Sequence, residues 1–295
     1  MIDVFGNKVE KDPILRDRFI EPPFSILDTK SGSWQKRKNI WKSIGIKSEV
    51  GRDATTFNMK SWTDEKLKDN KLPSDTSIFD PSLCEVLYHW FCEKGDKILD
   101  PFAGGSVRGV VANYLGYKYT GIDIRQEQID SNISQGEDIL GKENMPNWIC
   151  GDSNIVLDDI KDTFDFVFSC PPYADLEVYS DLEGDISNMP YSDFLGLYQS
   201  IIQKSCKKLK VGGMACFVVG EVRDKSGNYI GFVPDTIRCF VNSGLDYYNE
   251  AILLNSIASA SIRANGNMKS KKLVKIHQNI LIFKKNKEQS FSIFD

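Results

Sequence analysis

The chain has 295 residues, of which 41% are hydrophobic, and its formal net charge is -4. This length can bury a full doubly wound domain with extensions, whereas no apolar run is long enough to cross a membrane and the charged start is not a signal peptide. Seven scattered cysteines form no CxxC pair, and the only histidines are His89 and His277. These counts argue against a zinc site and favour reduced, mostly buried thiols in an intracellular, cytoplasmic protein.

Residues 1–75 are predicted to form an irregular N-terminal extension with two possible short helices, because prolines and glycines interrupt it. From Thr29 to Ser48 this extension carries six bases and no acids, with Trp34 and Trp41 among them. Such a segment suits phosphate contacts and base stacking, although a solvated surface segment has the same composition. The candidate nucleic-acid contacts here are Lys36, Arg37 and Lys38.

A strand, a glycine turn and a helix follow one another after a predicted helix at 81–92. The apolar strand 97–100 runs into the sequence DPFAGGS at 100–106, and apolar residues at helical spacing follow. Glycines let the backbone approach a ligand closely, and the start of the next helix offers free N–H groups. A second strand, 119–124, has Asp123 near its end, where an acid commonly accepts hydrogen bonds from ribose hydroxyls. This order of elements predicts a nucleotide site.

The next two strands are predicted at 147–150 and 164–169, and the second of them ends in the sequence SCPPY at 169–173. Proline has no N–H and a fixed φ, so the two prolines stop the sheet and stiffen the chain beyond it. Their carbonyls stay available as acceptors, and Tyr173 lies at the strand tip. This arrangement suits a site that grips a planar, amine-bearing ring, although Pro-Pro-Tyr alone also fits an ordinary strand end followed by a turn.

Together the two motifs resemble those of the S-adenosylmethionine-dependent DNA amino-methyltransferases, which methylate the exocyclic amine of adenine or cytosine. In that family the cofactor turn reads DPFxG followed by small residues, and the catalytic tetrapeptide reads Asp, Asn or Ser followed by Pro-Pro-Tyr or Pro-Pro-Phe. The resemblance covers about residues 75–220. Residues 22–52 also resemble DNA methylases of phages and prophages, which points to a phage-encoded enzyme of the restriction-modification type acting in the host cytoplasm.

The resemblance implies S-adenosylmethionine as the cofactor and DNA as the partner. It assigns the ribose hydroxyls to Asp123 and places Asp152, after the third strand, near the adenine amine of the cofactor. The implied catalytic residues are Cys170, Pro171, Pro172 and Tyr173. The implied cofactor-binding residues are Asp100, Pro101, Phe102, Gly104, Ser106, Asp123, Ile124 and Asp152. No metal is implied.

Two positions depart from the family pattern. Ser106 stands where the family usually has a third glycine, a minor change at a helix start. Cys170 stands where the family has Asp, Asn or Ser, whose side chain accepts a hydrogen bond from the target amine. Sulfur is a weak acceptor, so either the carbonyl of Pro171 carries more of that role, or Ser169 assists, or the chemistry differs.

The remaining chain predicts a helix at 192–209 and strands at 214–219, 247–254 and 277–283. Strands separated by helices indicate a mainly parallel sheet, and the last two strands can form an antiparallel pair at its edge. We therefore predict an α/β class I methyltransferase (Rossmann-like) fold with a seven-stranded, mainly parallel sheet and an antiparallel edge strand. The methyltransferase domain is expected at 76–295, with a basic insertion near 256–276.

Charge is unevenly distributed along the chain. Residues 121–195 contain seventeen acids and three bases, whereas residues 258–287 contain eight bases and no acids. Basic segments at both ends of an acidic centre favour phosphate contacts, and a solvated surface is the alternative. The acidic loop 174–189 could contact the target base, fold over the site or be solvated. The candidate nucleic-acid contacts near the C-terminus are Arg263, Lys269, Lys271 and Lys272.

The function expected from these observations is methyl transfer to the exocyclic amine of a flipped DNA base. We favour N4 of cytosine over N6 of adenine, because cysteine is closest in size and charge to the serine of the cytosine enzymes. Three alternatives stay open at this point. They are an RNA base-amine methyltransferase, a C5-cytosine enzyme that uses Cys170 as a thiolate, and a nucleic-acid-binding module without catalysis.

Overall fold

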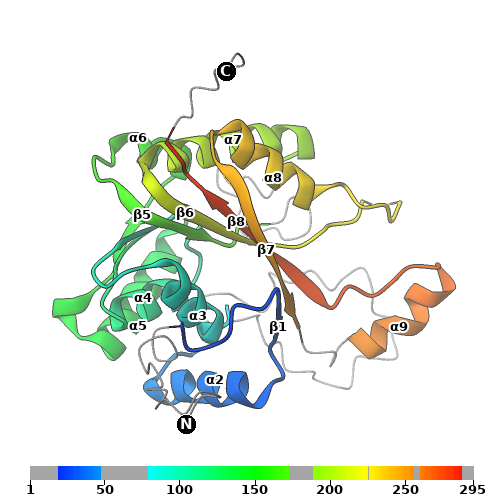
Figure 1. Ribbon diagram of the computed structural model, residues 1–295, viewed down its shortest axis with the longest axis horizontal. Helices are drawn as coiled ribbons and strands as arrows, with labels where there is room; N and C mark the ends of the chain where they lie inside the picture. Colours follow the sequence, from blue (N-terminus) through cyan, green and yellow to red (C-terminus); the bar gives the residue numbers. More distant parts are fainter. Residues whose placement is uncertain (1–18, 48–78, 173–188, 225, 256–259, 288–295) are drawn as a thin grey trace, which may run out of the picture.

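The computed structural model describes residues 19–47, 79–172, 189–224, 226–255 and 260–287, which form an eight-stranded sheet with helices on both faces (Figure 1). The strands are β1 (Ile26–Asp28), β2 (Lys97–Asp100), β3 (Lys118–Asp123), β4 (Asn147–Cys150), β5 (Phe164–Ser169), β6 (Leu209–Val219), β7 (Asp246–Leu254) and β8 (His277–Lys284). The helices are α2 (Gly32–Ile44), α3 (Pro81–Phe91), α4 (Val107–Tyr114), α5 (Gln126–Leu140), the 3-10 helix η3 (Lys142–Asn144), α6 (Ser153–Asp159), α7 (Tyr191–Lys208), α8 (Phe232–Asn242) and α9 (Ala260–Lys269).

The strand order is β1-β7-β8-β6-β5-β2-β3-β4. Neighbouring strands pair in parallel except at β8, which is antiparallel to both β6 and β7. Helices join most of the parallel neighbours, as such crossovers require. The predicted α/β class and all seven predicted strands are confirmed. The additional strand is β1, which pairs with β7 and covers the edge that β7 and β8 were expected to form.

The sheet separates two apolar layers. Strand β5 shows the alternation, because Phe166 and Phe168 pack with the helices α2–α5 while Val167 packs with α6–α8. All three side chains are fully buried. A strand that is covered on both faces reads as a continuous apolar run, which is the pattern that made β5 recognisable in the sequence.

The first described segment is part of this fold. Helix α2 begins after Ser31, whose side chain accepts a hydrogen bond from the N–H of Trp34, and ends at Gly45, whose φ of 117° suits glycine. Trp34 and Trp41 are only 2% and 3% exposed, and their indole N–H groups donate to Asp80 and Glu85 of the α3 region. The expectation that these tryptophans stack on bases is therefore wrong, because their apolar surface is buried against the α3 region.

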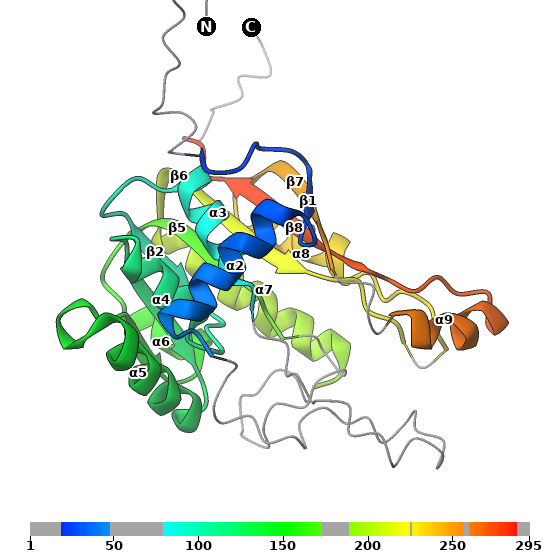
Figure 2. The ribbon, with the colours of Figure 1, turned by 90° about the horizontal axis from the view of Figure 1, so that it is seen from below.

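One helix stands apart from the body of the protein. Between β7 and β8, where the sequence shows no obvious helix, α9 projects beyond the sheet (Figures 1 and 2). We call residues 260–276 the basic arm, because this segment contains five bases and no acids. Met268 and Leu273 on the arm are 71% and 81% exposed, so little packing covers it.

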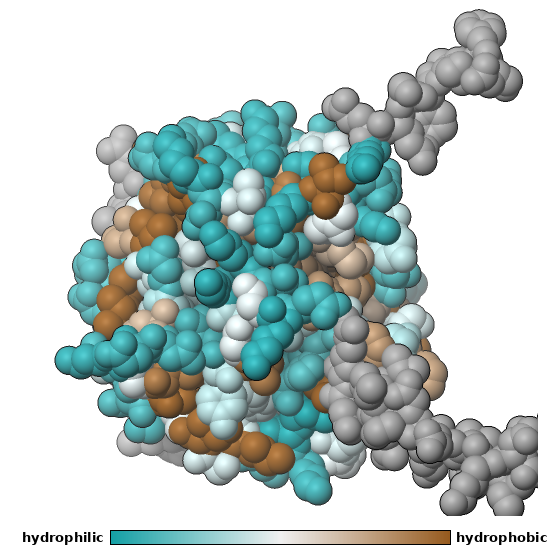
Figure 3. All heavy atoms as spheres, turned by 60° about the vertical axis from the view of Figure 1, so that its left-hand side comes forward, coloured by the Kyte–Doolittle hydropathy of each residue, from teal (hydrophilic) through white to brown (hydrophobic). Residues whose placement is uncertain are grey.

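Hydrophilic side chains predominate on the face shown in Figure 3, and the hydrophobic ones there form small separate groups. In the part of the chain that the structure describes, no helix has both the length and the apolar character needed to span a bilayer. All seven cysteines are free, and five of them are buried, which confirms the prediction of mostly buried thiols. Burial raises the pKa of the Cys206 and Cys239 thiols to about 12.

Candidate active site

The carboxyl ends of the parallel strands meet at one edge of the sheet, and the predicted site residues lie there. Strand β2 pairs with β3 on one side and with β5 on the other. Asp100 ends β2, Asp123 ends β3 and Ser169 ends β5. The glycine turn after β2 and the proline segment after β5 therefore leave the sheet as neighbours, as expected for ligand sites in such sheets.

The turn after β2, residues 101–106, is held against β3. Gly104 has a φ of 51°, which favours glycine. Its N–H donates to Asp123 Oδ2 at 3.0 Å, and its carbonyl accepts a hydrogen bond from Asn132 Nδ2 at 2.8 Å. Ser106 occupies the N-cap position of α4 without capping the helix through its side chain. Hydrogen bonds between the Gly104 backbone and the side chains of Asp123 and Asn132, and not a serine cap, thus fix the shape of this turn.

Two further acids lie at the ends of β3 and β4. Asp123 Oδ1 accepts the N–H of Arg125 at 2.9 Å, and Asp152 caps α6 by accepting the N–H of Asn154 at 2.8 Å. The N–H of Gly151 donates to the Asp123 carbonyl at 2.9 Å, so the two strand ends are joined. These bonds orient the two carboxylates that the sequence assigns to the cofactor.

A buried polar centre connects the glycine turn to the proline segment. It consists of Asp100, Arg108, Tyr119 and Ser169, each at most 4% exposed. Asp100 Oδ1 accepts hydrogen bonds from Ser169 Oγ at 2.5 Å and from the N–H of Phe102 at 3.2 Å. Asp100 Oδ2 accepts from Arg108 Nε at 2.5 Å and from the Tyr119 hydroxyl at 2.7 Å. The four donors match the approximate capacity of a carboxylate.

Arg108 of this centre also contacts groups other than Asp100. Arg108 Nη2 donates to the carbonyls of Phe102 and Ala103, each at 2.7 Å, and the guanidinium carbon lies 4.7 Å from the centre of the Phe79 ring. One side chain of α4 therefore contacts both the end of β2 and the turn that follows it. Breaking such a buried pair is costly, because it leaves a charge without compensation.

Electrostatics keep the centre in one protonation state. Burial is the largest influence on the pKa of Arg108 and lowers it, but the charge of Asp100, the neighbouring Tyr119 and Cys170 and the hydrogen bond to Asp100 together raise this pKa above its usual value. Burial and then the charge of Asp100 raise the pKa of the Tyr119 hydroxyl well above its usual value. Arg108 therefore stays charged and Tyr119 stays a donor at neutral pH, which keeps the bonds to Asp100 in place.

The proline segment begins directly after the buried centre. Cys170 is partly buried against the core that includes Phe168, Pro171 is buried and Pro172 is partly buried. The register of β5 against β6 ends with Ser169 opposite Phe217, so the chain leaves the sheet at Cys170, as the prolines predict. Tyr173 and most of the predicted acidic loop, residues 174–188, lie outside the described residues.

Residues 13–135 match a family model described as DNA methylase, a segment that includes β2, the glycine turn and β3. No curated protein matches the chain. Among solved structures, a putative RNA methyltransferase from Pyrococcus horikoshii is similar, with a TM-score of 0.50 and 15% identity over 86% of this chain and 98% of that one. The class I fold is thereby confirmed. The family match and this fold together support an S-adenosylmethionine-dependent methyltransferase.

Other structures that the chain matches include TrmN from Thermus thermophilus, with a TM-score of 0.47 and 12% identity over 70% of this chain and 49% of that one. The chain thus spans about half the length of TrmN. A putative rRNA-methylase from Clostridium thermocellum matches with a TM-score of 0.47 and 14% identity, over 71% of this chain and 99% of that one. The family model bears out the predicted resemblance to the DNA amino-methyltransferases and, with it, supports S-adenosylmethionine as the cofactor.

The predicted nucleic-acid contacts of the chain fall in two places. On α2, Arg37 pairs with Glu85 at 2.8 Å and Lys38 pairs with Asp80 at 3.1 Å, whereas Lys36 is exposed. Two of these three bases therefore hold α2 to the α3 region. The other candidates, Arg263, Lys269, Lys271 and Lys272, all belong to the basic arm.

Sequence reasoning missed Arg108, Tyr119 and the link through Ser169. A signal for Arg108 exists, because an arginine stands among the valines of the apolar helix 107–114, where a charge needs a buried partner. The buried partner of Arg108 is Asp100, the last residue of the strand that precedes this helix. Among the described residues, no cluster of histidine, cysteine and acidic side chains is arranged to hold a metal ion.

Proposed function

We propose that the methyltransferase transfers a methyl group to the exocyclic amine of a base flipped out of DNA, and we favour N4 of cytosine over N6 of adenine. The observation that carries the proposal is the hydrogen bond of 2.5 Å between Asp100 and Ser169. It ties the strand before the glycine turn to the residue before Cys-Pro-Pro. A methyl donor on the turn and an amine on the proline segment would then meet at one edge of the sheet.

The residues present fit the cofactor. S-adenosylmethionine supplies an activated methyl group on a sulfonium when it binds. Gly104 allows close approach of the backbone. We assign the ribose hydroxyls to Asp123, which accepts the N–H of Gly104, and the adenine amine to Asp152, which caps α6. The other proposed contacts are Pro101, Phe102, Ser106 and Ile124. Asp100 shapes the turn from behind, because its carboxylate already accepts four protein donors.

The acceptor nitrogen is the difficult partner, since its lone pair is delocalised into the ring. Fixed acceptors that take both amine hydrogens shift this nitrogen toward a nucleophilic geometry, and alignment with the donor lowers the barrier further. The carbonyls of Cys170, Pro171 and Pro172 are the acceptors that the proline segment offers. A rigid segment suits this role because its groups need no reorganisation during the reaction.

A base inside a duplex cannot reach this edge, so the proposal requires base flipping, at a cost of a few kcal/mol. Stacking on Tyr173 would return about 1–3 kcal/mol of that cost. DNA is favoured as the substrate because the family model that matches the glycine turn is one of DNA methylases. The basic arm extends from the end of β7 and the start of β8, on the same edge as the proline segment, and suits phosphate contacts.

The test is methyl transfer from labelled S-adenosylmethionine to unmodified duplex DNA in competition with structured RNA. The proposal predicts label in the DNA. Label only in the RNA would contradict the choice of DNA and support the RNA base-amine alternative. A wild type that transfers no label to either substrate and shows no calorimetric binding of the cofactor would contradict the enzymatic function and support a binding module.

A further inference from the structure

The loop between β6 and α8 contains a small hairpin. Arg223 and Tyr229 form an isolated antiparallel bridge, and the N–H of Ile230 donates to the Val222 carbonyl at 3.0 Å. At the tip, the N–H of Asp224 donates to the Asn228 carbonyl at 2.8 Å. The described residues of this hairpin therefore have a regular backbone, although the sequence contains no strand pattern there.

The hairpin is anchored to the body of the protein by one acid. Glu221 Oε1 accepts the N–H groups of Gly231 and Phe232 at 2.9 and 2.8 Å, and Oε2 accepts the N–H of Val233 at 3.4 Å. Val222 beside it is only 4% exposed. Because the carboxylate binds the N-terminus of α8, its negative charge is partly satisfied there and the hairpin is held at a fixed angle.

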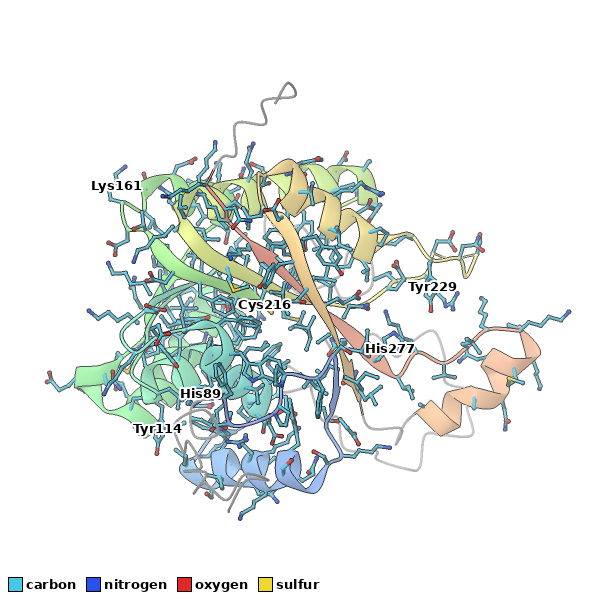
Figure 4. The ribbon with its side chains drawn as sticks, viewed as in Figure 1. His89, Tyr114, Lys161, Cys216, Tyr229 and His277 are labelled. Atoms are coloured by element: carbon cyan, nitrogen blue, oxygen red, sulfur yellow. The ribbon has the colours of Figure 1, made fainter. Side chains whose placement is uncertain are left out.

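An aromatic ring with a cation stacked on it lies exposed on this hairpin. The guanidinium carbon of Arg223 lies 3.9 Å from the centre of the Tyr229 ring, and Arg223 also donates to the Gly227 carbonyl at 2.7 Å. Tyr229 is nevertheless 50% exposed. Figure 4 shows Tyr229 on the outer part of the molecule, on the side where α9 projects. The Arg223 guanidinium and the Tyr229 ring are thus already stacked on each other, and part of the ring surface stays exposed to solvent.

The hairpin adjoins the basic arm. A Cβ added at Gly227 would lie 1.8 Å from Lys272 Nζ. The ammonium group of Lys272, a residue of the basic arm, therefore lies directly at the hairpin tip. The two segments leave the sheet together, because Val219 at the end of β6 is opposite Asn279 near the start of β8. This is the edge at which β5 ends in the proline segment. Two cations and an exposed ring thus lie together at the edge of the sheet that also carries the proposed site of methyl transfer.

We propose that the Arg223–Tyr229 pair is a stacking contact for a DNA base that neighbours the target base, and that Lys272 contacts the adjoining phosphate. The inference rests on the proposed function and adds a second contact to it. Aromatic rings and arginine planes accept any base by stacking, and a nearby ammonium group fits a phosphate. Flipping one base leaves its neighbour partly unstacked, which creates the surface that such a contact would cover.

The test compares Tyr229→Ala with Tyr229→Phe and with Tyr248→Ala. Tyr248 is a matched control, because it is 53% exposed and has Lys284 Nζ at 5.3 Å from its ring centre, but lies near the other end of the sheet. Anisotropy of a labelled single-stranded oligodeoxynucleotide gives the dissociation constant. We expect about tenfold weaker binding for Tyr229→Ala, from the usual contribution of one stacked base, and near wild-type binding for the other two variants.

Three results would overturn the proposed stacking: wild-type affinity in Tyr229→Ala, an equal loss in Tyr248→Ala, or no binding of DNA by the wild type. Tighter, Tyr229-dependent binding of RNA of the same sequence would overturn DNA as the partner. Methyl transfer to DNA, measured on the same wild-type sample, separates the two proposals. If the wild type methylates DNA but Tyr229→Ala does not change DNA binding, only the hairpin contact is contradicted. If DNA binds through Tyr229 but receives no methyl group, the proposed function is contradicted.

Discussion

The buried polar centre and the basic arm lie at the same edge of the sheet and use charge in opposite ways. In the centre, the charges of Asp100 and Arg108 compensate each other and both side chains are hydrogen-bonded inside the protein. In the arm, five bases occur without an acid, and two apolar side chains are largely exposed. The comparison indicates that the geometry of the centre is fixed without a ligand. The arm has no acid to compensate its bases, which is why we propose it as a contact for phosphates.

The largest expected effect is on stability. Replacing Arg108 by methionine leaves the Asp100 carboxylate buried without its counter-charge, so the free energy of unfolding should fall by about 3–5 kcal/mol. Urea unfolding measures this loss. Arg238→Met is the control, because Arg238 pairs with Asp235 on α8 but its side chain is 67% exposed, and at most about 1 kcal/mol is expected there. Equal, small losses in both variants would contradict the distinction between buried and exposed charge.

The link to the proline segment is tested by Ser169→Ala. This change removes a hydrogen bond to a charged acceptor, which typically contributes about 1.5–3 kcal/mol. We expect kcat to fall by at least tenfold while the affinity for S-adenosylmethionine changes little, as equilibrium dialysis would show. The control is Ser205→Ala on α7, whose hydroxyl donates to the Ile201 carbonyl at 2.8 Å. An unchanged kcat in Ser169→Ala would mean that the link has no part in catalysis.

Tyr173→Ala tests the expected stacking of the flipped base. Removing this stacking, which contributes about 1–3 kcal/mol, should reduce methyl transfer by roughly 5- to 150-fold. Cofactor binding should be unaffected, because the glycine turn is held by other residues. Steady-state rates on duplex DNA, together with calorimetry of the cofactor, give both quantities. Near-normal turnover would contradict a role for Tyr173 in methyl transfer.

The basic arm should govern the salt dependence of binding. Neutralising Lys269, Lys271 and Lys272 to alanine should reduce the slope of log affinity against log salt concentration by about 0.9 for each duplex phosphate that the arm no longer neutralises. Lys118→Ala is the control, since this exposed residue begins β3 at the opposite edge of the sheet. An equal change of slope in the control would show that the arm has no special role in binding DNA.

The smallest effect is expected at Cys170. Amine methylation needs an acceptor at this position, so Cys170→Ser should retain most of the activity. Complete loss of activity, together with a covalent adduct between the wild type and a pyrimidine, would instead support the C5-cytosine route through a thiolate. Rates with cytosine-containing oligonucleotides and mass analysis of the protein distinguish the two results.

The sequence predicted the central sheet because its buried strands and glycine turn are local patterns. The N-terminal segment was harder, since β1 has only three residues and the bases of α2 resemble a solvated helix. Their partners, Asp80 and Glu85, lie more than forty residues later and are joined to them only by tertiary packing. The buried centre was missed for the same reason, because Asp100 and Ser169 are 69 residues apart in the chain.

The position of the transferred methyl group distinguishes amine methylation from its alternatives. DNA incubated with the protein and deuterated-methyl S-adenosylmethionine is digested to nucleosides and separated by mass spectrometry. We expect the label on an exocyclic amine, with N4-methylcytosine as the favoured product. Label on C5 of cytosine, or DNA that carries no label while the cofactor is bound, would contradict this expectation.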